Sequence, residues 1–281
     1  MGSSKYNKKY LEEYDKKNEY IPLNRDYLFK GVMIKNKELF KIFLIDTLHL
    51  NVDKDDCNLI FLDKETIREN RKEHGKILDL NVKIGSKILV DVEVNRGAFS
   101  LVKRRNQLFV EKLDTLELET GDEYEVLNNK YTYQLNLNAK DTKDIGEEII
   151  LFYNLTKKKV YDNKIKIFLK HLEYYYKEYY NGVKLTKDEI FMASMMATSY
   201  KELYEMMSNI LEGEKLDKFI ESVIKMEREN FILHEWEKEK FDKMIEYNIR
   251  QEGIEEGIKE GIEQGIEQGI EQGEESKTLS M

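Results

Sequence analysis

The stretch ILDLNVKIGSKILVDVEVNRG, residues 77–97, constrains the fold more than any other part of this 281-residue chain. Apolar and polar residues alternate on both sides of a central turn, which is the period of a β-strand with one buried face. A three-residue loop at GSK places Asn81 opposite Asp91, whereas a two-residue turn sets polar residues against apolar ones. The same register sets Asp79 opposite Glu93. Because a slip of one residue flips a whole strand face, we predict a β-hairpin with the three-residue loop.

The polar face of this hairpin carries carboxylates that would repel one another if they faced each other directly. A hard divalent cation, Mg²⁺ or Mn²⁺, removes that repulsion, because it takes oxygen ligands and needs only one or two protein carboxylates. Asp79 and Glu93 are the candidate ligands, and the backbone carbonyl of Val94 is a candidate third. The alternative is a solvated sheet face on which the acidic side chains rotate apart.

Basic residues follow the hairpin at a short distance. A segment with helical spacing begins near residue 99, and the candidate phosphate-binding residues lie just before it or near its start: Arg96, Lys103, Arg104 and Arg105. A basic helix that leaves a metal-bearing strand is what a phosphodiester substrate requires. The alternative is an ordinary solvated helix face.

Apolar periodicity predicts the other elements of the chain. Asp26 is a candidate N-cap of a short helix, and a strongly apolar helix follows near residues 39–50. Strands are predicted at 58–62, 131–139 and 147–155, and residues 164–250 are predicted to be mostly helical. This order predicts an α/β fold of the α+β type, a sandwich with an all-helical C-terminal extension.

We divide the chain into four parts: a polar N-terminal arm or loose helix (1–21), a core (22–163), a helical extension (164–250) and a low-complexity tail (251–281). In the tail a glycine recurs at every fourth position from 253 to 273, and each glycine costs about 1 kcal/mol of helix stability relative to alanine. The tail is therefore either a frayed extension or a helix that forms against a partner. The second alternative, together with the C-terminal helices, predicts a homo-oligomer.

Composition narrows the class of protein. The net charge is −9, but residues 251–275 hold nine acids and one base, so the tail carries −8 and the rest of the chain −1. The acidity therefore does not exclude a nucleic-acid partner for the body. No apolar run approaches the roughly 20 residues of a membrane span, and the N-terminus lacks the apolar core of a signal peptide. With a single cysteine and no disulfide framework, we expect a cytoplasmic protein.

One spacing carries a resemblance to a known family. Asp79, thirteen intervening residues and then Glu93-Val94-Asn95 resemble the PD-(D/E)XK nuclease superfamily, and more narrowly its family of transposases, the recombination-promoting nucleases or Rpn proteins. The segment DYLFKGVM at 26–33, Phe99 and Arg105 after the motif, and the glycine-rich Glu/Ile tail are similar to features of that family.

The resemblance implies a restriction-endonuclease-like sandwich with a central mixed sheet flanked by helices. It also implies a Mg²⁺-dependent DNA endonuclease associated with recombination or mobile elements. It implies that Asp79 and Glu93 hold the metal, that the residue at position 95 orients water or stabilises the transition state, and that Asp26 lies near the site. The sequence departs from the family at Asn95, where lysine or glutamine is usual. Two alternatives stay open: a catalytically weakened member that binds DNA or self-associates, and a structural interaction module.

Overall fold

The computed structural model describes residues 5–55, 57–62, 80–96, 103–115, 129–140 and 144–229, with the backbone alone at 103–105 and 228–229. All of these belong to one compact unit, Met1–Glu229, and a second unit, Asn230–Met281, holds the repeat tail and lies outside the described residues. The elements of the first unit are α1 (Lys8–Asp15), α2 (Asp26–Lys35), α3 (Lys37–Thr47), β1 (Leu59–Phe61), β2 (Leu80–Ile84), β3 (Ile88–Asn95), α4 (Lys103–Thr115), β4 (Tyr131–Asn138), β5 (Glu147–Asn154), β6 (Lys159–His171), α5 (Leu172–Tyr180), α6 (Lys187–Ser194), α7 (Tyr200–Met207) and α8 (Gly213–Glu229).

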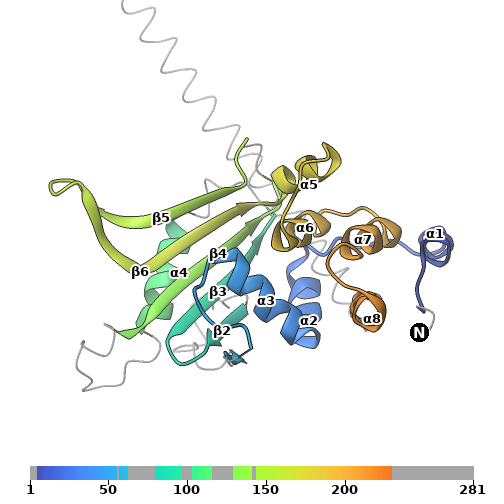
Figure 1. Ribbon diagram of the computed structural model, residues 1–281, viewed down its shortest axis with the longest axis horizontal. Coiled ribbons are helices and arrows are strands. Elements are labelled where there is room, and N and C mark those ends of the chain that lie inside the picture. Colours follow the sequence, from blue (N-terminus) through green and yellow to red (C-terminus); the bar gives the residue numbers. More distant parts are fainter. Residues whose placement is uncertain are drawn as a thin grey trace, which may run out of the picture. The chain divides into compact units, whose positions relative to one another are not determined.

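The described strands form one mixed sheet in the order β1-β2-β3-β4-β6-β5 (Figure 1). β1, β2 and β3 are antiparallel neighbours, as short turns permit. β4 runs parallel to β3, and the chain makes the crossover that this requires through α4. The mixed sheet flanked by helices confirms the predicted α+β class.

The hairpin of β2 and β3 has the predicted register. Asn81 pairs with Asp91, and Ile84 pairs with Ile88 across a three-residue loop. Gly85 in that loop has φ +60°, a conformation that glycine adopts at no steric cost. The two-residue turn is therefore excluded by the structure.

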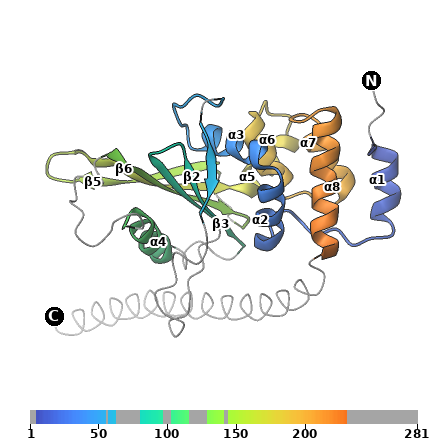
Figure 2. The ribbon, with the colours of Figure 1, turned by 90° about the horizontal axis from the view of Figure 1, so that it is seen from below.

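The two faces of the sheet differ in chemistry. On one face the main apolar core joins the alternating valines of β3 to the helices on that side, for example Val92 of β3 to Val32 of α2 and Phe191 of α6. On the other face α4 packs through Val110 against Ile167 and Leu169 of β6. Figure 2 shows α4 on the side of the sheet away from α3.

The structure corrects two of the expected helix features and confirms a third. The helical interpretation of residues 164–171 is wrong, because these residues complete β6, and α5 starts only at Leu172. The N-cap assignment of Asp26 is also wrong, because α2 begins at Asp26 and its N-cap is Arg25, which makes no side-chain capping bond. The helical alternative for the N-terminal arm is confirmed by α1, whose Leu11 is fully buried.

Candidate functional site

The polar side of β3 is buried. Asp91, Glu93 and Asn95 occupy alternate positions and therefore share one face of the strand. Their exposed fractions are 0%, 3% and 6%, so the alternative of a solvated acidic face is wrong for β3. Because an ionised carboxylate is costly to bury unless it is paired, hydrogen-bonded or bound to a metal, these side chains point to a specific role.

Neighbouring strands extend this polar face. β4 pairs with β3 in parallel, so that Gln134 lies beside Asp91, Asn136 beside Glu93, and Asn138 beside Asn95. All three β4 side chains are buried. On the opposite side of β3, Asn81 of β2 is buried next to Asp91. We call this set of seven residues the polar face: Asn81, Asp91, Glu93, Asn95, Gln134, Asn136 and Asn138.

Hydrogen bonds link most of the polar face. The amide of Gln134 donates to Oδ2 of Asp91 at 2.9 Å. Asn95 donates from Nδ2 to Oδ1 of Asn136 at 3.1 Å and to Oδ1 of Asn138 at 3.2 Å. Asn136 in turn donates to Oε1 of Gln134 at 3.3 Å. Neutral amides thus provide the polar surroundings that let acidic residues remain inside the sheet layer.

α4 covers this polar face. Gln134 and Asn136 pair in register with Ile167 and Leu169, the two β6 residues against which Val110 of α4 packs. Near the end of the same helix, Oδ1 of Asp114 accepts a 2.7 Å hydrogen bond from Thr132 Oγ1 on β4. The predicted helix after the hairpin is therefore confirmed over Lys103–Thr115, and it lies against the acidic strand.

The donor set fits a hard cation. Carboxylate oxygens of Asp91 and Glu93 and amide oxygens of β4 are the ligand types that Mg²⁺ and Mn²⁺ prefer. Within the described ranges, no group of three His, Cys, Asp or Glu side chains is close enough to hold a metal ion. Asp79, the predicted partner of Glu93, lies outside the described residues, so the pairing of these two carboxylates stays a prediction.

The other predicted site residues lie in different places. Val94 points its side chain into the main apolar core, so only its backbone carbonyl is available for the predicted ligand role. Asp26 begins α2, which packs on the apolar face, and it forms a 2.9 Å ion pair with Lys30 one turn along the same helix. The predicted role of Asp26 near the site stays a prediction.

The predicted phosphate-binding residues surround the start of α4. Arg96 directly follows β3 and is half-buried. Lys103, Arg104 and Arg105 form the first turn of α4, where only the backbone is described. Their helix is the one that covers the polar face, and the directions of their side chains stay a prediction.

The polar residues of β4 were not among the predicted site residues. The alternation in YTYQLNLN indicates a strand with one polar face, but neutral amides on a strand usually face water. His171 at the end of β6 is a further buried polar residue, and it pairs in register with Asn138. Its Nε2 lies 3.1 Å from Oε1 of Glu148 on β5. The sequence shows the polar residues of β4 and β6 but not that they are buried. Their burial depends on the elements that pack against the sheet.

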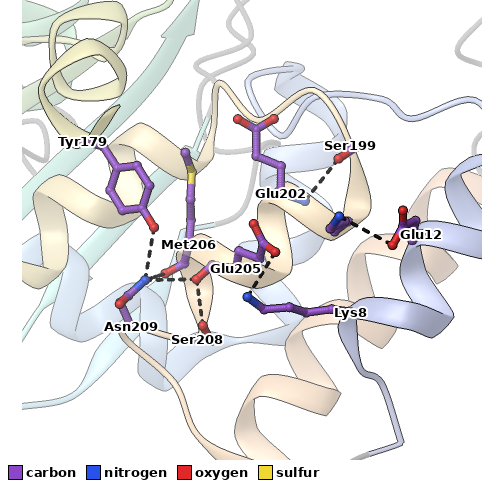
Figure 3. Close-up of polar contacts among 10 residues, drawn as sticks. Lys8, Glu12, Tyr179, Ser199, Glu202, Glu205, Met206, Ser208 and Asn209 are labelled. Atoms are coloured by element: carbon purple, nitrogen blue, oxygen red, sulfur yellow. Dashed lines mark hydrogen bonds and ion pairs between the residues drawn. The ribbon is translucent and has the colours of Figure 1, made fainter. Parts of the chain in front are cut away.

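A second concentration of polar contacts surrounds α7 (Figure 3). Ser199 Oγ accepts from the backbone N–H of Glu202 at 3.1 Å and caps the helix, while Lys8 of α1 lies 3.1 Å from a carboxylate oxygen of Glu205. Asn209 donates to the backbone carbonyl of Glu205 at 3.0 Å beyond the other end. These contacts satisfy helix ends and join α1 to α7, which is a structural role.

Among the described residues, no helix is long and apolar enough to span a membrane. Comparisons with models of protein families, with curated proteins and with solved structures find no match for this chain. The class of protein must therefore be argued from the site and its chemistry.

Proposed function

We propose that this chain is a metal-dependent DNA endonuclease of the PD-(D/E)XK type, related to the recombination-promoting nuclease transposases. The observation that carries the proposal is the burial of Glu93 and Asp91 on the polar face of a central strand, beneath a helix that begins with three basic residues. A mixed sheet flanked by helices is the arrangement expected of a restriction-endonuclease-like fold, and it supports the same proposal.

In the proposed site, Glu93 and Asp79 hold Mg²⁺ or Mn²⁺ with the carbonyl of Val94. When bound, such a cation lowers the pKa of a coordinated water and stabilises negative charge on a phosphodiester in the transition state. Arg96 and the first turn of α4 contact phosphate oxygens of the DNA backbone and set its register.

Asn95 has a positioning role in this proposal. Its side chain is neutral, so it cannot take a proton from the attacking water. Its Nδ2 donates to Asn136 and Asn138, at 3.1 and 3.2 Å, which holds β4 amides beside Glu93. These hydrogen bonds occupy the amide nitrogen of Asn95. They therefore favour the second candidate function, a catalytically weakened member that binds DNA or self-associates.

Plasmid nicking in Mg²⁺ tests the proposal. The wild type should nick supercoiled DNA, and Asp79→Ala and Glu93→Ala should lose the metal-dependent cleavage. Glu111→Ala, which removes an exposed acid from α4, is the matched control and should cleave normally. If the wild type binds DNA without cleaving it, the weakened-member alternative replaces the proposal. If it neither binds nor cleaves, a structural interaction module is the better account.

A further inference from the structure

The hairpin of β5 and β6 continues past the part of the sheet that helices cover (Figures 1 and 2). We define the distal arm as residues 151–166, bounded by the register pair Leu151 and Lys166. Two register shifts fall in this arm, between Leu151 and Phe152 and between Phe152 and Tyr153. Such irregularities are typical of strands that leave the plane of a sheet.

The distal arm is basic although the chain is acidic. Five lysines and one acid, Asp162, give the arm a charge of +4 in a chain of net charge −9. Three of the lysines, 157–159, are consecutive and exposed at the turn. Asp162 Oδ1 accepts a 2.8 Å hydrogen bond from the backbone N–H of Lys164, so this carboxylate also has a local structural role.

Large apolar side chains are exposed on both surfaces of the arm. Leu155 and Tyr161 are 82% and 77% exposed near the turn. Phe152 and Tyr153 are each about half exposed, and consecutive strand residues point to opposite surfaces. A planar surface such as a membrane would contact one side only, whereas a groove with two walls contacts both.

A groove of about 620 Å³ runs beside the arm. Lys130 and Lys164 line it together with Tyr161, and Asp114 and Asp162 line it as well. Asp114 accepts a hydrogen bond from Thr132. The groove therefore combines two lysines, two carboxylates and an aromatic side chain, next to the helix that covers the polar face.

We propose that the distal arm binds double-stranded DNA, with its lysines on the phosphates and Leu155 and Tyr161 in a groove of the duplex. A two-stranded β-ribbon fits the major groove, which is about 12 Å wide, and apolar side chains insert between base steps in the minor groove. The positive charge of the arm would repel the tip of a second copy, which disfavours self-association there. The inference rests on the DNA substrate of the proposed function and adds a contact surface to it.

Fluorescence anisotropy with a labelled DNA duplex, in EDTA so that cleavage cannot occur, tests the arm in the full chain. The triple variant Lys157→Gln, Lys158→Gln, Lys159→Gln should bind at least roughly tenfold more weakly, and the salt slope should fall by about one per lysine in contact. Leu155→Ala and Tyr161→Ala should each weaken binding about threefold or more, as expected for lost apolar and stacking contacts. The triple change to arginine should keep the affinity.

The matched control changes Lys9, Lys16 and Lys17 to glutamine. These lysines are exposed, in α1 or directly after it, and the change in net charge is the same. Figure 2 shows α1 at the opposite end of the described fold from β5 and β6. Equal affinity of the arm and control variants would overturn the inference. Binding to vesicles of anionic phospholipid that exceeds DNA binding, or a dimer that Tyr161→Ala dissociates, would also overturn it.

Cleavage is measured separately so that the two proposals can fail independently. The wild type and the triple-glutamine variant of the arm are therefore also assayed for nicking of supercoiled DNA in Mg²⁺. A wild type that binds through the arm but does not nick would sink the nuclease proposal alone. A triple-glutamine variant that binds and nicks DNA like the wild type would sink the arm proposal alone.

Discussion

Hydrogen bonds from single side-chain amides, such as that of Asn95, link the buried polar residues of this sheet. One nitrogen donates to two β4 carbonyl oxygens, those of Asn136 and Asn138, and the neighbouring Gln134 donates to Asp91. Each of these amides supplies a dipole without adding charge. The buried carboxylates of the polar face therefore lie among neutral side-chain dipoles that stabilise them.

Removing the Asn95 side chain should destabilise the fold. Asn95→Ala takes away the donor that Asn136 and Asn138 share, and a buried polar group that loses its partner costs about 1–3 kcal/mol. Urea denaturation should show a lower midpoint with an unchanged slope. Asn163→Ala, at an exposed β6 position, should leave the midpoint unchanged. An unaltered midpoint for Asn95→Ala would contradict the hydrogen-bond network.

The pH dependence of stability should report on Glu227. Burial raises its pKa to about 8, although the backbone N–H of Ile21 donates to its Oε1 at 3.1 Å. The unfolded-state pKa is near 4.5. Between these values the folded state binds one more proton than the unfolded state, so the contribution of this group to stability falls as the pH rises.

Glu227→Gln should therefore flatten the decline in stability between about pH 5 and pH 8 and raise stability at pH 8 by up to roughly 4 kcal/mol. Thermal unfolding across this range measures the effect. Glu212→Gln changes an exposed glutamate and serves as the control. A variant that loses stability at pH 8 would show that the ionised carboxylate is needed there.

For single residues, the sequence predicted the register of the hairpin and which acidic residues share its polar face. The alternation of residues 80–95 favours the three-residue loop, because a two-residue turn would set polar residues opposite apolar ones. It did not predict that the amides of β4 would be buried beside them. A polar alternation reports which residues share a face. What covers that face depends on a helix elsewhere in the chain.

The elements at the N-terminal end depend on contacts that are distant in sequence. Asp15, at the end of α1, accepts hydrogen bonds from the backbone N–H groups of Tyr200 and Lys201 at 2.8 and 3.1 Å. These are first-turn donors of α7 that have no partner within that helix. α1 therefore supplies a cap to a helix about 185 residues further along the chain.

Asp15→Ala should weaken the attachment of α1 to α7. Loss of the two hydrogen bonds should cost about 1–2 kcal/mol, the range of a lost helix cap. Hydrogen exchange at Tyr200 and Lys201 should accelerate, while Glu19→Ala, in an exposed position, should leave it unchanged. Slow exchange at both amides in Asp15→Ala would contradict this tertiary cap.

The elements also show where periodicity misleads. In residues 164–169, KIKIFL, the first four alternate and the last three are apolar, so a strand and a buried helix compete. No glycine or proline separates them from the helix that starts at Leu172. These residues form a strand because they pair with β4 and β5, and the local sequence does not reveal that pairing.

Across the whole molecule, charge is unevenly distributed. The tail at 251–275 carries −8 and the distal arm +4, so the net charge describes neither. The glycine-isoleucine repeat is marginal as an isolated helix, and a partner would have to stabilise it. The proposed partner is a second copy of the chain.

Truncation after Ile249 should therefore yield a smaller assembly in sedimentation velocity. If the isoleucines that follow the glycines of the repeat make the apolar contact between copies, their loss should shift the distribution toward monomer. Changing the five isoleucines that follow glycines to serine in the full chain gives a variant of unchanged length that should assemble like the truncation. An unchanged number of chains per particle for both variants would leave the repeat as a frayed extension.

Binding of a divalent cation by Glu93 is the step on which the proposed activity depends. Calorimetric titration of Mn²⁺ into the full chain, without DNA, measures it directly. The wild type should bind saturably, Glu93→Gln should bind at least about tenfold more weakly because a charged oxygen ligand is lost, and Glu111→Gln should bind like the wild type. Equal affinity of the wild type and Glu93→Gln would contradict a metal site on the polar face.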